Sequence, residues 1–152
     1  MTIMCAKWTC VLICATAWAA TAPARAQGAR TFKTRLAPVP IDITMQATVS
    51  GFGSVSAALI GAKVTITGTF EGLRSPATIA QVHKSPVRGV RGPVLFDLKA
   101  TAATSGTISG TIDLTPAQVA DLEKGRLYVQ LHSEKAPDGN LWGWLMPSEG
   151  KR

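Results

Sequence analysis

Two segments near the end of the chain alternate between apolar and other residues. Alternation places every second side chain on the same face of a strand. On the face expected to be buried lie Leu127, Val129, Leu131, Leu141 and Leu145. If the two segments form an antiparallel hairpin, apolar must face apolar, which pairs Leu131 with Leu141 and Leu127 with Leu145.

The opposite face of this hairpin carries polar and aromatic side chains. The same register places Tyr128 beside Trp144, Gln130 beside Trp142, and His132 beside Asn140. An open surface of this kind stacks on sugar rings or anchors a protein partner. The alternative is that the tryptophans pack under a loop or a second sheet.

The rest of the chain also has a β pattern. Short β-rich segments separated by Gly, Pro, Asp or Ser occupy residues 41–49, 55–70, 78–84, 93–100, 106–114, 126–133 and 140–146. Seven or eight strands at this spacing indicate an all-β sandwich or barrel.

One short connecting helix is predicted at about residues 116–124. Thr115 provides the N-cap, Gln118 completes a capping box, and Gly125 offers a left-handed stop. Asp138 and Gly139 form a dipeptide that favours a tight reversal, so the hairpin turn is expected within residues 135–140.

The first 26 residues have the pattern of a signal peptide. Lys7 precedes the apolar run 8–20, and Ala-Arg-Ala at 24–26 predicts cleavage between Ala26 and Gln27. A retained membrane anchor is the alternative, but the run is shorter and richer in Ala and Thr than a permanent span. We expect an exported protein, periplasmic or secreted, with no transmembrane segment in the mature chain.

The organisation that follows is a flexible lead-in at 27–40, a folded domain at 41–146 and a C-terminal tail at 147–152. All three cysteines lie in the leader, so the mature domain has no disulfide. The net charge of the chain is +7, and without Lys7 and Arg25 it is +5. This charge favours anionic partners, although a modest positive charge is also common in ordinary soluble domains.

A basic turn lies between two predicted strands. Lys84, Arg88 and Arg91 alternate with Gly and Pro, an arrangement that suits a phosphate, sulfate or carboxylate. The alternative is a solvated turn whose glycines serve backbone geometry.

The two histidines of the chain occur in similar contexts. Gln81 precedes His83 by two residues, as Gln130 precedes His132, so adjacent strands could bring both imidazoles together. Such a pair is a weak copper or zinc signal. A histidine near a strand end that simply hydrogen-bonds to backbone is the alternative, and no cofactor is expected otherwise.

The residue types argue against an enzyme. Two histidines are too few for a dinuclear redox site, and no Gly-x-Ser-x-Gly motif surrounds Ser75, Ser85 or Ser133. Ser133 adjoins His132 in sequence, but neighbours on a strand point to opposite faces. Nucleic acid is not an expected partner, because no strand combines aromatic and basic residues in an RNA-binding pattern.

Several segments resemble the CHRD domain family, named after chordin. They are residues 68–98, 105–133 and 137–145, and the features that match best are Gly72 to Thr78, Gly89 to Val94, Leu114 to Val129 and the turn from His132 to Gly139. The resemblance implies an extracytoplasmic domain with an immunoglobulin-like or Greek-key β-sandwich and supplies no established catalytic activity. We therefore expect a non-enzymatic module that binds a protein, a glycan or another anionic extracytoplasmic ligand.

The chain departs from the CHRD pattern at three places. Members often have His-x-His where this chain has Gln81 and His83, and Asn where it has Gln130. They tend to have Arg and Gln in place of Trp142 and Trp144. The missing first histidine weakens the metal hypothesis, and the tryptophans make the outer face more apolar than the pattern implies.

Overall fold

Residues 28–148 are described by a computed structural model of the protein. The predictions on the signal peptide, its cleavage site, its cysteines and the last four residues lie outside this range. Within it the chain forms nine strands and one helix: β1 (Arg30–Pro38), β2 (Phe52–Ile60), β3 (Lys63–Glu71), β4 (Ala77–Lys84), β5 (Val94–Ala100), β6 (Gly106–Asp113), α1 (Pro116–Glu123), β7 (Leu127–Ser133), β8 (Ala136–Trp144) and β9 (Met146–Pro147).

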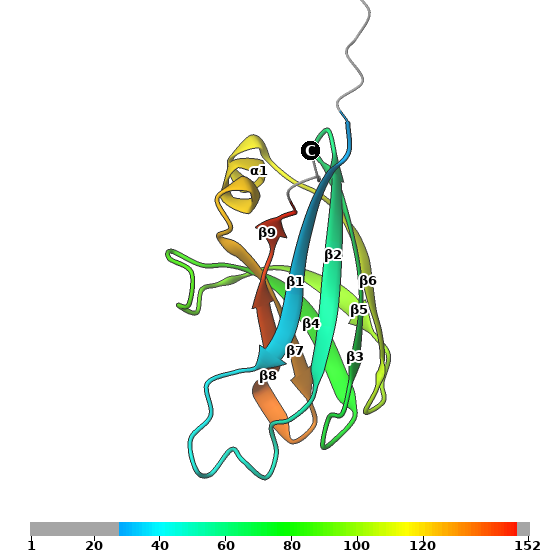
Figure 1. Cartoon of the computed structure of the whole chain (residues 1–152), viewed down its shortest axis with the longest axis vertical. Coiled ribbons are helices and arrows are strands. Elements are labelled where there is room, and N and C mark those ends of the chain that lie inside the picture. The colour runs from blue at the N-terminus through cyan, green and yellow to red at the C-terminus, as the bar shows by residue number, and fades with distance from the viewer. Residues whose placement is uncertain (1–27, 149–152) are drawn as a thin grey trace, which may run out of the picture.

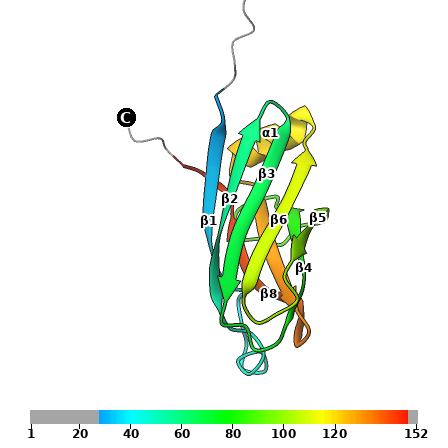
Figure 2. The ribbon, with the colours of Figure 1, turned by 90° about the vertical axis from the view of Figure 1, so that its right-hand side faces the viewer.

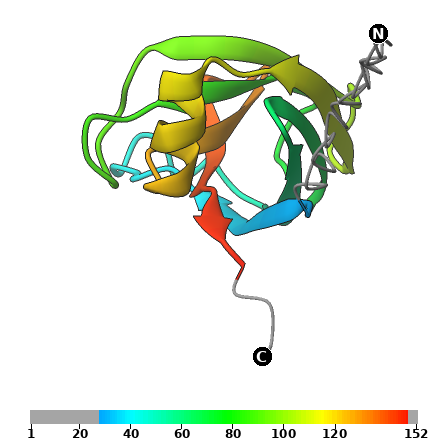
Figure 3. The ribbon, with the colours of Figure 1, turned by 90° about the horizontal axis from the view of Figure 1, so that it is seen from above.

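The strands form one antiparallel sheet that closes on itself. Its order is β2-β3-β6-β5-β4-β7-β8-β1-β9, with a further pairing between β2 and β1. Figure 3 shows the resulting ring of strands from above. The predicted all-β class with one short helix is confirmed, but the eight strands from β1 to β8 make a barrel-like sheet and not the expected immunoglobulin-like sandwich.

β1 closes the ring and corrects the prediction of a flexible lead-in. Along most of its length β1 pairs with β2, from Arg30 opposite Leu59 to Leu36 opposite Gly53. Its end then pairs with β8, where Ala37 lies opposite Trp142. Phe32 and Leu36 are buried, and the polar residues between them hid this pattern in the sequence.

Residues 41–49, predicted to form the first strand, form turns instead. The Asp42 carboxylate accepts hydrogen bonds from the backbone amides of Thr44 and Met45. Such local bonds compete with a strand ladder. Ile43, whose side chain would have to be buried in a strand, is exposed.

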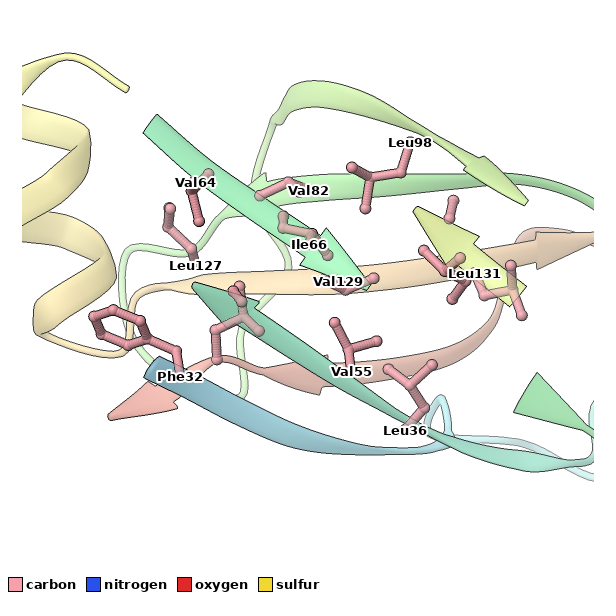
Figure 4. Packing of buried hydrophobic residues seen from close by; sticks show 14 of the residues in the cluster. Phe32, Leu36, Val55, Val64, Ile66, Val82, Leu98, Leu127, Val129 and Leu131 are labelled. Carbon is pink, nitrogen blue, oxygen red and sulfur yellow. The ribbon is translucent and has the colours of Figure 1, made fainter. Parts of the chain in front are cut away.

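The core fills the inside of the ring. Its buried residues come from all eight strands of the ring. The largest of them include Phe32, Ile66, Leu127, Leu131 and Leu141. Figure 4 shows side chains from both sides of the ring meeting in the middle. Each burial of a side chain of this size contributes about 1.5–3 kcal/mol to folding.

The predicted helix is confirmed, as is its capping. The Thr115 hydroxyl accepts a hydrogen bond from the Gln118 amide, and the Gln118 side chain accepts one from the Thr115 amide. Gly125 follows with φ of +65°, the left-handed conformation that ends the helix. No helix in residues 28–148 has the length and apolar character needed to cross a membrane.

The predicted position of the β7–β8 turn is wrong. β7 ends at Ser133 and β8 begins at Ala136, so Glu134 and Lys135 make the reversal. Ser133 lies opposite Ala136, and the register shifts between Leu131 and Ser133. Gly139 does have a positive φ, but it lies inside β8, where the register between β7 and β8 shifts.

Candidate functional site

The register predicted for the final hairpin is confirmed where the aromatic residues lie. Tyr128 is opposite Trp144, Gln130 is opposite Trp142, and Leu131 is opposite Leu141. The amide of Leu145 donates to the carbonyl of Leu127 and extends the pairing by one step. The irregularity near the turn prevents the expected pairing of His132 with Asn140, whose side chain instead donates to Ser133 Oγ.

Four rings from β4, β7 and β8 form one aromatic cluster: His83, Tyr128, Trp142 and Trp144. Tyr128 is at its centre, with its ring centroid 4.8 Å from that of His83 and 4.9 Å from that of Trp144. The two indoles meet edge to face at 4.6 Å. Such pairs stabilise a structure by about 0.5–1.5 kcal/mol beyond the area that they bury.

This face is covered, which corrects the expectation of an open surface. Tyr128 and Gln130 are buried, whereas Trp142 and Trp144 keep part of their surface exposed. The loop Ser85–Pro93 between β4 and β5, called the β4–β5 loop below, lies against Tyr128 and Trp142, and Asp138 of β8 contacts Gln130. Sequence alternation gives the side of a strand but cannot tell what lies over it.

The C-terminal end of the β4–β5 loop, at Arg91 and Gly92, is held in place by hydrogen bonds and ring contacts. The Gly92 amide donates to Tyr128 Oη at 3.1 Å, and the Gly92 carbonyl accepts from His83 Nδ1 at 3.0 Å. Arg91 donates to the Asp138 carbonyl at 2.7 Å and lies over the Trp142 ring at 5.9 Å. The loop is therefore fixed to β4, β7 and β8.

The two histidines approach each other as predicted from their similar contexts. Their ring centroids lie 6.4 Å apart. His132 Nδ1 lies 2.7 Å from the Pro137 carbonyl oxygen. His83 Nδ1 lies at a similar distance from the Gly92 carbonyl oxygen. A carbonyl oxygen only accepts, so each ring carries a proton on Nδ1. Both Nε2 atoms are buried without a hydrogen-bond partner.

The surroundings of His83 favour its neutral form. Burial lowers its pKa below the ordinary value of 6.5, and electrostatic interaction with the nearby His132 and Arg91 lowers it further, against the opposing hydrogen bond to Gly92. No group of three or more His, Cys, Asp or Glu side chains in residues 28–148 is arranged to hold a metal ion. Any ion at the two imidazoles would need its remaining ligands from other atoms.

The three cations of the basic turn have different environments. Lys84 forms an ion pair with the buried Asp121 at 2.7 Å, and Arg91 is engaged as described above. An Arg88 guanidinium nitrogen lies 3.7 Å from Met146 Sδ, a weak contact on an exposed residue. Of the three, Arg88 is best placed to meet a ligand.

The β4–β5 loop also exposes apolar side chains, which the sequence analysis missed. Val87 is 64% exposed and Val90 is 49% exposed, and Val94 at the start of β5 is 47% exposed. Figure 1 shows this loop projecting from the side of the barrel below α1. The Val-Arg pair that occurs twice in this loop was the available signal for exposed apolar side chains. The Gly and Pro around it favoured the interpretation that the loop serves backbone geometry alone.

The comparison with protein families agrees with this architecture. The family model of the CHRD domain matches residues 36–145. The chain belongs to the CHRD domain family. No curated protein and no solved structure matches it.

The residues that carry the CHRD resemblance have structural roles in this chain. Ser75 Oγ accepts a hydrogen bond from the Lys135 amide, and Thr115 caps α1. Gly92 packs so tightly that an added Cβ would lie 1.7 Å from the Lys84 carbonyl oxygen. The residues that carry the resemblance therefore shape the loops of this CHRD domain, and Trp142 lies beneath Arg91 of the β4–β5 loop.

Proposed function

We propose that this CHRD domain is an exported, non-enzymatic binding module whose β4–β5 loop contacts an acidic protein partner. The observation that carries the proposal is the construction of this loop: its base is fixed by buried groups while its tip presents valines and a cation. Loops held by a rigid scaffold are common binding elements. Exposed apolar side chains gathered on one loop are typical of a contact surface.

The chemistry of the tip supports a protein as the ligand. Val87 and Val90 offer apolar area, and Arg88 between them offers a cation with planar donors that suit a carboxylate. Ser85 Oγ lies within hydrogen-bonding distance of both the Val87 and the Val90 carbonyls, and this contact holds both valines in one turn. In this proposal Trp142 and Trp144 support the loop from below, and Tyr128 and Gln130 are structural.

The absence of enzymatic activity is part of the proposal. Both imidazoles direct Nδ1 to backbone carbonyls, and neither makes a hydrogen bond to a serine hydroxyl in the described part of the chain. A general base needs such contact with the proton that it removes. The chemistry of this face is thus suited to packing and recognition.

The experiment is site-specific photo-crosslinking in cells that express the full chain. A photoreactive residue at position 87 is expected to give a discrete adduct, which the double variant Val87→Ser, Val90→Ser reduces in a competition assay. The matched control is a photoreactive residue at position 124, at the end of α1 and exposed. The same adducts from both positions would overturn the proposal.

Export is tested separately by the mass of the protein recovered from periplasm and medium. We expect a mature chain that begins at Gln27. Recovery of the uncleaved chain in the cytoplasm would remove the extracytoplasmic part of the proposal.

A second candidate function is weak binding of copper or zinc at His83 and His132. The specific observation in its favour is that both rings commit Nδ1 to a carbonyl and leave a buried, unpaired Nε2. Metal-binding histidines commonly have this second hydrogen bond. The ring centroids lie 6.4 Å apart, and one ion bonded to both Nε2 atoms at about 2 Å would need those two atoms within about 4 Å of each other.

Titration calorimetry with Cu²⁺ and Zn²⁺ tests the metal candidate. Binding by the parent domain, with loss in both His83→Ala and His132→Ala, would support it. The matched control is Gln81→Ala. The Gln81 side chain donates a hydrogen bond to Asp97, and this bond involves neither imidazole ring. Equal heats for the parent and the histidine variants would exclude this pair as the site.

A further inference from the structure

The outer face of β1, β2, β3 and β6 is covered with hydroxyl groups. In β3 the inward residues Val64 and Ile66 are buried, whereas Thr65, Thr67 and Thr69 are exposed. β2 and β6 repeat this alternation with Ser and Thr outside. Figure 2 shows these four strands side by side on a face of the barrel different from the one that carries the β4–β5 loop.

The strand register arranges these side chains in rows that cross the sheet. Each residue of such a row lies directly opposite the next, on the same face. One row, called the hydroxyl row below, runs through five strands and consists of Lys33, Ser56, Thr67, Ser109 and Lys99. The next row contains Arg35, Ser54, Thr69 and Thr107.

The hydroxyl row has a cation at each end and three hydroxyls between them. With adjacent strands about 4.8 Å apart, the path along the curved sheet from Lys33 to Lys99 is roughly 19 Å, and the straight distance between their Cα atoms is shorter because the sheet closes on itself. Arg35 lies two residues from Lys33 on the same strand and adds a second cation at that end. The row therefore spans several sugar rings of an extended chain, with positive charge at both edges.

The face is hollowed along this row. A hollow of about 720 Å³ lies over β1, β2 and β3 and is lined by Lys33, Thr34, Arg35, Ser54, Val55, Ser56, Thr67, Gly68 and Thr69. None of these residues is acidic. A second hollow of about 410 Å³ continues over β3, β5 and β6 and includes Lys99 and Asp97. The Asp97 carboxylate accepts a hydrogen bond from Gln81 at 2.7 Å, which offsets part of its charge.

Threonine is a strong strand former, so a solvated threonine face is common in β proteins. The two end cations, their common row and the two neighbouring hollows along it distinguish this one. We propose that the hydroxyl row binds an extended acidic polysaccharide, with its carboxylate or sulfate groups at Lys33, Arg35 and Lys99. Ser56, Thr67 and Ser109 exchange hydrogen bonds with the sugar hydroxyls.

The composition of the face selects this ligand class. The two hollows along the hydroxyl row contain no aromatic side chain on which a nucleobase could stack, the usual feature of sites for single-stranded nucleic acid. The exposed Phe52 and Ile60 lie at the two ends of β2, away from Ser56, so an apolar protein surface or a lipid tail gains little along the row itself. The proposal is independent of the function proposed for that loop.

The test compares two double variants with the same loss of charge. Lys33→Ala with Lys99→Ala removes both ends of the hydroxyl row, and Lys124→Ala with Lys135→Ala removes two exposed cations elsewhere. The probes are fluorescent alginate for carboxylates, dextran sulfate for sulfates and neutral dextran. We expect the first double variant to bind the acidic probe about tenfold more weakly. The second should change binding less than about twofold, because its contribution is only the long-range field.

A third variant separates the hydroxyls from the charges. This triple variant carries Ser56→Ala, Thr67→Val and Ser109→Ala, which remove the hydroxyl donors and keep the shape and charge of the face. We expect it to bind the polysaccharide more weakly than the parent at both low and high salt. Far-UV circular dichroism checks that each variant is folded. Equal losses in the two lysine double variants, or equal affinity of the parent for duplex DNA or anionic phospholipid vesicles, would overturn the proposal. Val87→Ser with Val90→Ser should leave polysaccharide binding unchanged, so failure of one proposal is distinguishable from failure of the other.

Discussion

Gly92 and Tyr128 are joined by a hydrogen bond from the Gly92 amide to Tyr128 Oη at 3.1 Å. The two residues are 36 positions apart in the chain. Tyr128 is fully buried, so its hydroxyl needs a partner, and the loop amide supplies one. This contact connects the aromatic cluster to the loop that carries our proposed contact residues.

The first prediction concerns Tyr128→Phe. The ring and its stacking remain, but the Gly92 amide loses its acceptor, so we expect the free energy of unfolding to fall by about 1–3 kcal/mol. Urea denaturation measures this change. Faster amide exchange at Gly92 with unchanged exchange in β2 and β3 would place the effect in the loop. Unchanged stability and exchange would show that the hydrogen bond contributes nothing net.

The second prediction compares two glycines of the β4–β5 loop. A Cβ at Gly92 would meet the Lys84 carbonyl oxygen at 1.7 Å, whereas a Cβ at Gly89 meets nothing within 4 Å. Gly92→Ala should therefore destabilise the fold by more than about 3 kcal/mol or displace the loop. Gly89→Ala should cost about 1 kcal/mol, because only its φ of +94° is strained. Thermal unfolding of both variants checks the order, and equal costs would contradict it.

The third prediction is a pH dependence caused by His83. Its pKa is lowered in the folded protein, so below the ordinary value of 6.5 the unfolded chain binds the proton more readily than the folded chain does. Stability is therefore complete above about pH 6.5 and falls as the pH drops below it toward the native pKa. Urea denaturation from pH 8 to pH 5 measures this. His83→Gln should flatten the profile, and an unchanged slope would assign the effect to other groups.

The fourth prediction concerns the ion pairs of Asp121. Its carboxylate is buried and lies 2.7 Å from Lys84 Nζ and 3.7 Å from an Arg126 nitrogen. Asp121→Asn should lower the free energy of unfolding by about 1–2 kcal/mol, since both cations are partly exposed and the loss is smaller than for a fully buried pair.

The control for this prediction is Asp113→Asn. Asp113 pairs with Lys63 at 3.6 Å, and both side chains are well exposed. Screening by solvent should keep the change below about 0.5 kcal/mol. Chemical denaturation at low and high salt compares the two variants, and similar losses would contradict the argument.

Local patterns predicted some elements well. The capping box of Thr115 and Gln118 is a contact between residues three apart, so the sequence contains all of it. The pairing of Leu131 with Leu141 follows from alternation on two neighbouring segments. The Asp138-Gly139 dipeptide does not form the predicted turn, because a glycine with positive φ serves a bulge as readily as a turn.

Other features depended on distant parts of the chain. Arg30–Pro38 looked irregular because three polar residues separate the buried Phe32 from Leu36, yet it pairs with β2 on one side and β8 on the other. These two strand pairings form where the ring closes, so the local composition of residues 30–38 gives little sign of them. The same closure turned an expected sandwich into a barrel-like sheet.

The sequence alone determined which side chains share a face, because that depends only on the two-residue period of a strand. Alternation placed Tyr128, Gln130 and the two indoles on one face. Only the tertiary structure decided how much of this face meets water. Tyr128 and Gln130 are buried while Trp142 and Trp144 stay partly exposed, since burial is set by what the rest of the chain places over a face.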